Sequence, residues 1–222
     1  MKTLTISALD GFQLGAYLAE PAGEPLGGIV VVQEIFGVNA HIRSICDRFA
    51  EAGYMAIAPA IFDRMTPGFE VGYAPKEIEH AKGLMQEFDI KSSLLDIEAA
   101  RTRVCAAGNV GVVGFCLGGS LAWLAATRLD GFSAASSFYG GMVNQFSSET
   151  PRCPVQLHYG ADDASIPAEN YLSVRNQCPE AAFYLYENVG HGFNCDQRGS
   201  YAPEAAALAW DRTLQLFESA LG

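Results

Sequence analysis

Basic side chains are scarce in this sequence. Its 222 residues include 14 Lys and Arg against 25 Asp and Glu, which gives a formal net charge of −11. Nucleic acids and anionic membrane surfaces bind clustered Lys and Arg, so the sequence predicts neither as a partner. Long hydrophobic runs are also lacking, since no apolar stretch approaches the ~20 residues that a membrane helix needs, and residues 1–6 contain no apolar core of a leader peptide. We therefore expect a cytoplasmic protein that acts on a small organic molecule.

Paired cysteine motifs are absent as well. The 6 cysteines, at positions 46, 105, 116, 153, 178 and 195, are scattered along the chain without a Cys-x-x-Cys pair. Small secreted proteins use close cysteine spacings as a disulfide framework, and structural zinc sites use paired spacings. The nearest approach to a metal cluster is His191, Cys195 and Asp196, which has no second pair. The sequence therefore predicts no metal site and no cofactor.

Hydrophobic residues make up 50% of the chain, enough for one large core, and we expect a single domain over residues 1–222. The oligomeric state stays open, with a monomer slightly favoured. Residues 29–32, Ile-Val-Val-Val, are typical of a strand that is covered on both faces of a parallel sheet. Strands and helices alternate, which favours an α/β protein with a mostly parallel central sheet and helices on both faces. The predicted strands are residues 4–6, 14–18, 29–32, 54–58, 110–114, 134–139, 155–159 and 183–186, and the predicted helices are residues 41–52, 76–86, 90–106 and 203–221.

Residues 63–75 are predicted to form a loop, because Pro67, Gly68, Gly72 and Pro75 interrupt any regular element. A loop at the carboxyl edge of a sheet either covers a pocket or is a plain surface connection. The sequence leaves both alternatives open.

The most informative stretch is residues 110–120, Val-Gly-Val-Val-Gly-Phe-Cys-Leu-Gly-Gly-Ser. An apolar run ends at Gly114, Cys116 follows, and Gly118 and Gly119 open an apolar segment with helical spacing. Gly-x-nucleophile-x-Gly between a strand and a helix is the nucleophile elbow of α/β-hydrolases, whose turn is too tight for a Cβ at the glycines. A cysteine at a helix N-terminus is favoured as a thiolate. The alternative is a buried apolar cysteine in a glycine-rich turn.

An acid and a histidine follow two later strands. Asp162 and Asp163 come after the predicted strand 155–159, and His191 comes after the strand 183–186. The chain order nucleophile, acid, base is the order that α/β-hydrolases use, and each residue stands at a strand end, where open α/β sheets place their ligands. The three residues together favour the catalytic interpretation of the cysteine.

A carboxylate also follows the strand 29–32, within Gln33-Glu34-Ile35-Phe36-Gly37. In hydrolases of this architecture, the loop after the equivalent strand supplies one backbone N–H to the oxyanion hole, and the residue after the nucleophile supplies the other. We expect these donors to be Ile35 and Leu117. Glu34 is either part of the site or a solvated loop residue, because an unpaired carboxylate is costly to bury.

On these motifs, the chain resembles the dienelactone hydrolase family, the carboxymethylenebutenolidases, of the α/β-hydrolase superfamily. The resemblance covers nearly the whole chain and implies a three-layer α/β-hydrolase fold. It further implies that Cys116 is the nucleophile, His191 the base and Asp163 the acid that orients the base. In this family the residue equivalent to Glu34 hydrogen-bonds the resting thiol and shares its proton until substrate displaces it.

Two family arginines that clamp a substrate carboxylate are missing, because the matching positions are Cys195 and Ile78. Neither side chain replaces a guanidinium. Four other cations either compensate or are solvated at the surface, namely Arg64, Lys76, Lys82 and Arg198. We expect Arg64 and Phe36 to contact the substrate, which is a neutral or differently shaped ester or lactone.

The sequence thus predicts a hydrolase that cleaves a small ester or lactone through a thioester on Cys116. One alternative is a ligand-binding or redox-responsive protein on the same fold. Another is an enzyme for a different acyl bond, such as a thioesterase.

Overall fold

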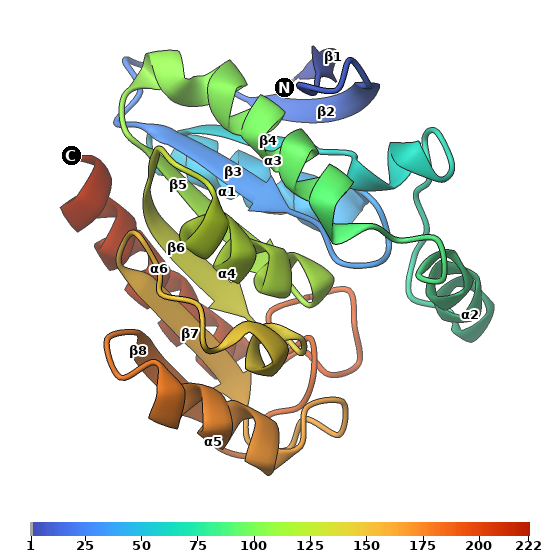
Figure 1. The fold of residues 1–222 in the computed structure, drawn as a ribbon, viewed down its shortest axis with the longest axis vertical. Helices are drawn as coiled ribbons and strands as arrows, with labels where there is room; N and C mark the ends of the chain where they lie inside the picture. The colour runs from blue at the N-terminus through green and yellow to red at the C-terminus, as the bar shows by residue number, and fades with distance from the viewer. Residues whose placement is uncertain (1) are drawn as a thin grey trace.

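The computed structural model describes residues 2–222 and has an eight-stranded central sheet (Figure 1). The strand order is β1-β2-β4-β3-β5-β6-β7-β8. Neighbouring strands are parallel from β4 to β8, whereas β2 is antiparallel to both β1 and β4. The predicted, mostly parallel sheet is confirmed. The strands are β1 (Lys2–Ser7), β2 (Gln13–Ala19), β3 (Gly28–Val32), β4 (Met55–Pro59), β5 (Val110–Phe115), β6 (Phe132–Phe138), β7 (Val155–Gly160) and β8 (Ala182–Tyr186).

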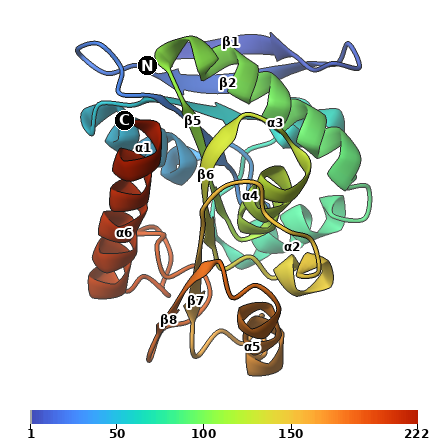
Figure 2. The same cartoon turned by 60° about the vertical axis from the view of Figure 1, so that its left-hand side comes forward.

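Helices cover both faces of this sheet. Figure 2 shows α1 and α6 on one face and α3, α4 and α5 on the other, which gives three layers. The helices are α1 (Ala40–Glu51), α2 (Pro75–Leu84), α3 (Ile90–Val104), α4 (Leu117–Arg128), α5 (Ala168–Gln177) and α6 (Pro203–Leu221), with short 3₁₀ turns η1 (Ile61–Arg64), η2 (Cys105–Ala107) and η3 (Val143–Phe146). None of the helices formed by residues 2–222 combines the length and the apolar composition needed to cross a bilayer.

The central strands and their covering helices follow from local sequence. Every residue of β3 and β5 is buried, as expected for apolar strands between two helix layers. The side chain of Asn39 accepts a hydrogen bond from the Ile42 N–H at 3.2 Å and so caps α1. The last helix, α6, has an apolar face that includes the buried residues Phe217 and Leu221. This face packs on the central sheet.

The structure departs from the predicted elements in two segments. The sequence predicts no helix at α5, because residues 168–177 have no clear apolar stripe. In the structure this helix buries only Tyr171 and Val174. The predicted loop 63–75 also has more order than expected, since its start lies in η1 and Glu70 forms an isolated antiparallel bridge with Gly37. Other element ends differ from the prediction by at most two residues, which is the usual uncertainty of such boundaries.

Four chemically reactive side chains follow four parallel strands. Glu34 comes after β3, Cys116 after β5, Asp163 after β7 and His191 after β8. The carboxyl ends of parallel strands meet at one edge of a sheet, and ligands bind there in open α/β folds.

Candidate active site

The turn between β5 and α4 presents Cys116 in a strained backbone conformation. Its φ is 56° and its ψ is −114°, a left-handed value that non-glycine residues rarely adopt. Glycines on either side of Cys116 allow the backbone to turn this tightly. A Cβ at Gly114 would overlap the Gly118 carbonyl, and a Cβ at Gly118 would overlap the Val32 carbonyl. The sequence therefore forces a sharp strand-to-helix turn with a thiol at its tip, as the elbow motif predicts.

His191 and Asp163 form a hydrogen-bonded pair beside this turn. His191 Nδ1 lies 2.7 Å from Asp163 Oδ2, and the second carboxylate oxygen, Oδ1, accepts a hydrogen bond from the Ser165 N–H at 2.8 Å. Burial lowers the pKa of His191, but hydrogen bonds to Asp163 and Cys116 outweigh burial and raise the pKa to about 10. The imidazole beside Cys116 thus favours its protonated form.

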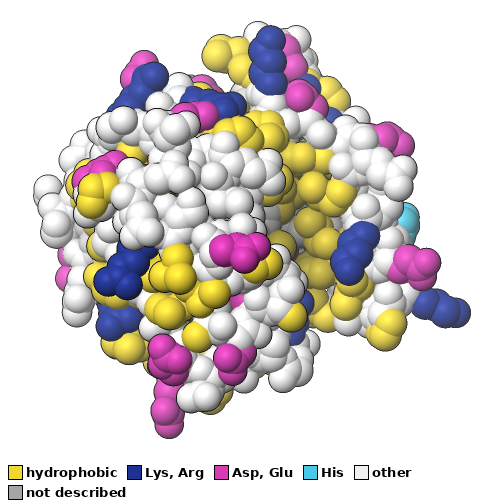
Figure 3. Space-filling model, turned by 60° about the horizontal axis from the view of Figure 1, so that its bottom comes forward, with side chains coloured by type: hydrophobic (Ala, Val, Ile, Leu, Met, Phe, Trp, Pro, Cys, Tyr) yellow, Lys and Arg dark blue, Asp and Glu magenta, His cyan; other side chains and the backbone are white. Residues whose placement is uncertain are grey.

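A cavity of about 440 Å³ opens onto these groups. Cys116 and His191 both line it, together with the apolar side chains of Phe36, Met142 and Ile166. Figure 3 shows apolar side chains gathered in a hollow on this side of the molecule. The thiol is therefore accessible to a small organic molecule and is surrounded mainly by apolar walls.

The backbone N–H groups of Ile35 and Leu117 have no hydrogen-bond partner among residues 2–222, and both residues line the same cavity. Leu117 is the first residue of α4, where N–H groups have no acceptor within the helix. Two unpaired donors next to a nucleophile form a suitable site for a developing oxyanion.

Glu34 is fully buried and is held by two side chains. Tyr73 donates its hydroxyl proton to Glu34 Oε2 at 3.0 Å, and Arg198 Nη1 donates to Glu34 Oε1 at 3.2 Å. Within the described residues, no hydrogen bond joins the Glu34 carboxylate to Cys116. Burial lowers the pKa of Arg198, but the negative charge of Glu34 is the largest of the effects that raise it above its usual range. The carboxylate is thus the acceptor of a buried ion pair rather than a solvated loop group.

Tyr73 is a site residue that the sequence did not predict. It lies in the predicted loop 63–75, which the bridge between Gly37 and Glu70 and a 3.1 Å hydrogen bond from the Val71 N–H to the Phe36 carbonyl fasten beside Glu34. The loop therefore helps to enclose the site. Gly37, which pairs with Glu70 of this loop, lies far away in the chain, and no local sequence pattern in residues 63–75 predicts the pairing.

The predicted substrate contacts divide into two groups. Phe36 lines the cavity, but Arg64 does not: it pairs with Asp96 at 2.7 Å and with Asp10 at 2.8 Å. The expectation that Arg64 contacts the substrate is therefore wrong, because Asp96 and Asp10 already bind its guanidinium.

The other three cations named from the sequence differ in their distance from the cavity. Lys82 and Arg198 line the cavity, whereas exposed Lys76 does not. At the two positions matching the family arginines, Ile78 lines the cavity and Cys195 is fully buried. Arg198, three residues beyond Cys195, brings a guanidinium to Glu34 from a different position in the chain.

Comparison with known proteins identifies the family of this chain. The sequence profile of the dienelactone hydrolase family matches residues 14–221. A carboxymethylenebutenolidase of Pseudomonas putida is 34% identical over 222 residues, covering 95% of this chain and 93% of its own, and a candidate carboxymethylenebutenolidase of Synechocystis sp. is 37% identical over 239 residues, covering 99% and 97%. The crystal structure of a candidate dienelactone hydrolase from Klebsiella pneumoniae superposes with a TM-score of 0.83 at 30% identity, covering 98% of this chain and 99% of that one. The predicted three-layer α/β-hydrolase fold is confirmed, and the chain belongs to the dienelactone hydrolase family.

Proposed function

We propose that this protein hydrolyses a small carboxylic ester or lactone, with Cys116 as the nucleophile, His191 as the base and Asp163 as the residue that orients the base. One observation carries the proposal: the strained Cys116 faces His191 in an open cavity, and His191 is hydrogen-bonded to Asp163 at 2.7 Å. A nucleophile, a base and an orienting acid in this arrangement are the requirements of covalent acyl transfer.

Acylation uses the thiolate and the two free N–H groups. The Cys116 sulfur attacks the carbonyl carbon, and the carbonyl π electrons move to oxygen, which the Ile35 and Leu117 N–H groups stabilise by several kcal/mol, on the order of 3 for one such donor. The tetrahedral intermediate then collapses and breaks the bond to the leaving oxygen. Protonated His191 gives its proton to that alkoxide or enolate, so that the leaving group departs neutral.

Deacylation regenerates the thiol. Neutral His191 takes a proton from water, the hydroxide oxygen attacks the thioester carbon on Cys116, and the carbon–sulfur bond breaks. The products are a carboxylic acid and the enzyme, with the proton back on the thiolate–imidazole pair. Asp163 keeps the ring oriented in both steps through its bond to Nδ1.

Glu34 has a restraining role in this proposal. Its buried negative charge disfavours a second negative charge on Cys116 in the empty site, whereas His191 favours it. Support comes from the ion pair with Arg198 and the bond from Tyr73, which keep the carboxylate inside the protein. Movement of Glu34 toward the thiol, as the family resemblance implies, is part of the proposal.

The cavity favours a neutral substrate. Its walls are mainly apolar, through Ile78, Met85, Met142 and Ile166, and its partly buried guanidinium, Arg198, is already neutralised by Glu34. A substrate carboxylate would find little net positive charge at that point. We therefore expect neutral esters and lactones to be cleaved with a higher kcat/KM than carboxylate-bearing ones of equal size, and the reverse order would contradict this part.

Intact-mass detection of acylated Cys116 tests the proposal directly. Small lactones, aryl esters and thioesters are offered to the wild type and to Cys116→Ser, Cys116→Ala and His191→Ala. The expected result is an acyl adduct or turnover in the wild type, with neither in Cys116→Ala, while circular dichroism shows an intact fold. Near-native turnover by Cys116→Ala overturns the nucleophile assignment. No adduct and no turnover with any compound favours ligand binding, and a preference for thioesters favours a thioesterase. A single domain, a cytoplasmic location and a monomeric state are further predictions that size-exclusion chromatography and fractionation address.

A further inference from the structure

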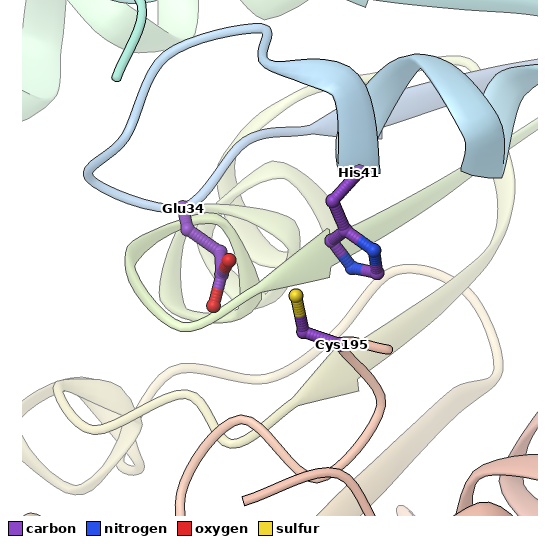
Figure 4. A group of neighbouring side chains, drawn as sticks. All are labelled: Glu34, His41 and Cys195. Carbon is purple, nitrogen blue, oxygen red and sulfur yellow. The ribbon is translucent and has the colours of Figure 1, made fainter. Parts of the chain in front are cut away.

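Three side chains of types that can bind a metal ion lie close together beside the active site. Glu34 comes from the loop after β3, His41 from the first turn of α1, and Cys195 from the loop after β8 (Figure 4). A carboxylate oxygen, an imidazole nitrogen and a thiol sulfur from these residues all lie within 4.8 Å of one another, and all three residues are buried. The sequence predicts no metal site, and its nearest approach to a cluster is His191, Cys195 and Asp196. The cluster that the fold assembles comes instead from three distant segments.

His41 has no hydrogen-bond partner in this position. Its exposed fraction is 1%, yet neither ring nitrogen is hydrogen-bonded within residues 2–222. Nδ1 lies 3.4 Å from Asp196 Oδ1, which is too poorly aligned for a hydrogen bond but close enough to orient the ring. Nε2 likewise has no hydrogen-bond partner among residues 2–222. Buried imidazole nitrogens are normally hydrogen-bonded, so an unpaired one beside a carboxylate and a thiol is available to bind a ligand.

A second cavity, of about 290 Å³, adjoins this cluster at His41. Asp196 also lines it, with a side chain that is 62% exposed. Asn194 lines it too and is 3% exposed, with both amide atoms unpaired among the described residues. The cavity also contains Arg48, whose guanidinium stacks on Trp210 at 3.8 Å. This polar cavity is separate from the catalytic one and borders the cluster on the His41 side, whereas Glu34 and Cys195 do not line it.

We propose that Glu34, His41 and Cys195 form a binding site for a zinc-class divalent cation. One thiolate, one imidazole and one carboxylate match the ligands that Zn²⁺ takes, and three protein ligands leave a fourth position for water. Binding forms a metal–sulfur bond and releases the Cys195 proton to solvent. The Glu34 carboxylate, the Cys195 thiolate and the neighbouring Asp196 carboxylate then offset the charges of the cation and of Arg198.

The neighbours of the cluster have suitable supporting roles. Asp196 Oδ1, 3.4 Å from His41 Nδ1, is the carboxylate oxygen nearest to that nitrogen and can hold the ring once Nε2 binds the cation. Tyr73 and Arg198 each use one lone pair of a different Glu34 oxygen. Each carboxylate oxygen has a second lone pair, so these bonds leave room for a metal bond. Hydrogen-bonded carboxylates and imidazoles of this kind orient metal ligands in proteins.

Cobalt binding tests the site independently of activity. The Cys116→Ala protein is used throughout, because it removes the catalytic thiol as a competing ligand and makes the result independent of the proposed hydrolysis. Metal-free protein is titrated with Co²⁺, and the thiolate-to-cobalt charge-transfer band and the visible bands are recorded. We expect one equivalent to bind, loss of the charge-transfer band on adding Cys195→Ser, and retention of the band on adding Cys105→Ser, a matched change at an exposed thiol.

Two further measurements keep the result interpretable. Adding Asp196→Asn changes an exposed side chain and should weaken Co²⁺ binding by about 10–100-fold while leaving the fold intact. Zn²⁺ should displace Co²⁺ and bleach both sets of bands. A Cys116→Ala protein without a charge-transfer band, or a band that survives Cys195→Ser unchanged, overturns the proposal. So does Co²⁺ affinity that is unaffected by Asp196→Asn.

Discussion

Glu34 is the residue whose burial most needs explanation, because its side chain is 1% exposed and carries a charge at the end of an apolar strand. A buried carboxylate is tolerated when hydrogen bonds and an opposite charge compensate for the lost water. Here Arg198 supplies the charge and Tyr73 a hydroxyl. The two partners come from segments 39 and 164 residues away, so this compensation exists only in the folded chain.

The ion pair predicts strong coupling between two substitutions. Arg198→Met leaves the Glu34 carboxylate buried with one hydroxyl partner and should lower the free energy of unfolding by about 3 kcal/mol. In a Glu34→Gln background the same change should cost about 1 kcal/mol or less, because no buried charge is then stranded. Urea denaturation of the four proteins in chelator-treated buffer measures both values. Equal costs in the two backgrounds would show that the pair is not coupled.

The raised pKa of His191 predicts the high-pH side of the rate profile. His191 must be protonated to give its proton to the leaving oxygen, so kcat/KM should fall as the pH rises through about 10. Asp163→Asn removes the negative charge and weakens the hydrogen bond that help to raise the pKa of His191. That variant should lose about 10²–10⁴ in kcat/KM, and its high-pH limb should move to lower pH. An unmoved limb in Asp163→Asn would assign the titration to another group.

At the scale of elements, the segment between η1 and α2 is the clearest case of order that comes from distant contacts. It is fastened by the bridge from Glu70 to Gly37 and by the bond from Asn39 Nδ2 to the Val71 carbonyl at 3.2 Å. Gly37 has a φ of 79°, and a Cβ there would overlap the Phe69 carbonyl. The close approach of the segment therefore depends on this glycine.

Gly37→Ala should release that segment. The alanine is strained at positive φ and collides with backbone, so we expect a loss of more than about 1 kcal/mol of stability, faster hydrogen exchange in residues 66–73 and lower kcat/KM as Tyr73 leaves Glu34. Gly83→Ala is the matched control. It lies in α2 with no atom within 4 Å of the added Cβ, and should stabilise the protein by about 0.5–1 kcal/mol. Unchanged exchange in residues 66–73 of Gly37→Ala would show that the bridge does not hold the segment.

The same contrast explains what the sequence could predict. Strands such as β3 and β5 have continuous apolar runs, and the elbow requires its glycines locally, so their places follow from residues close together in the chain. The carboxyl ends of parallel strands then converge by topology, which brings Cys116, Asp163 and His191 together. Tyr73 and Arg198 have no such local signal. Their positions depend on packing between distant segments, and α5 likewise lacks an apolar stripe that would reveal it.

At the scale of the whole molecule, the sheet encloses an ionisable group in its interior. His158 lies in β7 with an exposed fraction of 0%, stacked on Phe138 at 4.5 Å and on Tyr184 at 5.2 Å between ring centroids. Its Nδ1 is 2.9 Å from the Tyr186 hydroxyl, and its Nε2 has no partner among residues 2–222. Burial, and to a smaller extent the charge of Arg212, lower the pKa of His158 from 6.5 to about 3.

This histidine should contribute to acid unfolding of the entire protein. Between pH 6.5 and about 3 the imidazole is neutral when folded and protonated when unfolded, so the unfolded chain binds the extra proton. The free energy of unfolding therefore falls as the pH is lowered, by up to about 1.4 kcal/mol per unit from this group alone. The contribution is complete above pH 6.5 and is lost progressively below it.

His158→Phe isolates that contribution. Phenylalanine keeps the aromatic stack but loses the bond to Tyr186, so the variant should be about 1 kcal/mol less stable at about pH 7. Between about pH 7 and about pH 5 the free energy of unfolding of the wild type should fall by ~2 kcal/mol more than that of the variant. The stability difference between the two proteins should therefore narrow or reverse. Urea denaturation at both pH values measures the change, and His80→Gln, at an exposed histidine, gives the baseline for replacing a histidine elsewhere. If the gap between wild type and His158→Phe is the same at both pH values, the protons that destabilise the protein in acid bind at other groups.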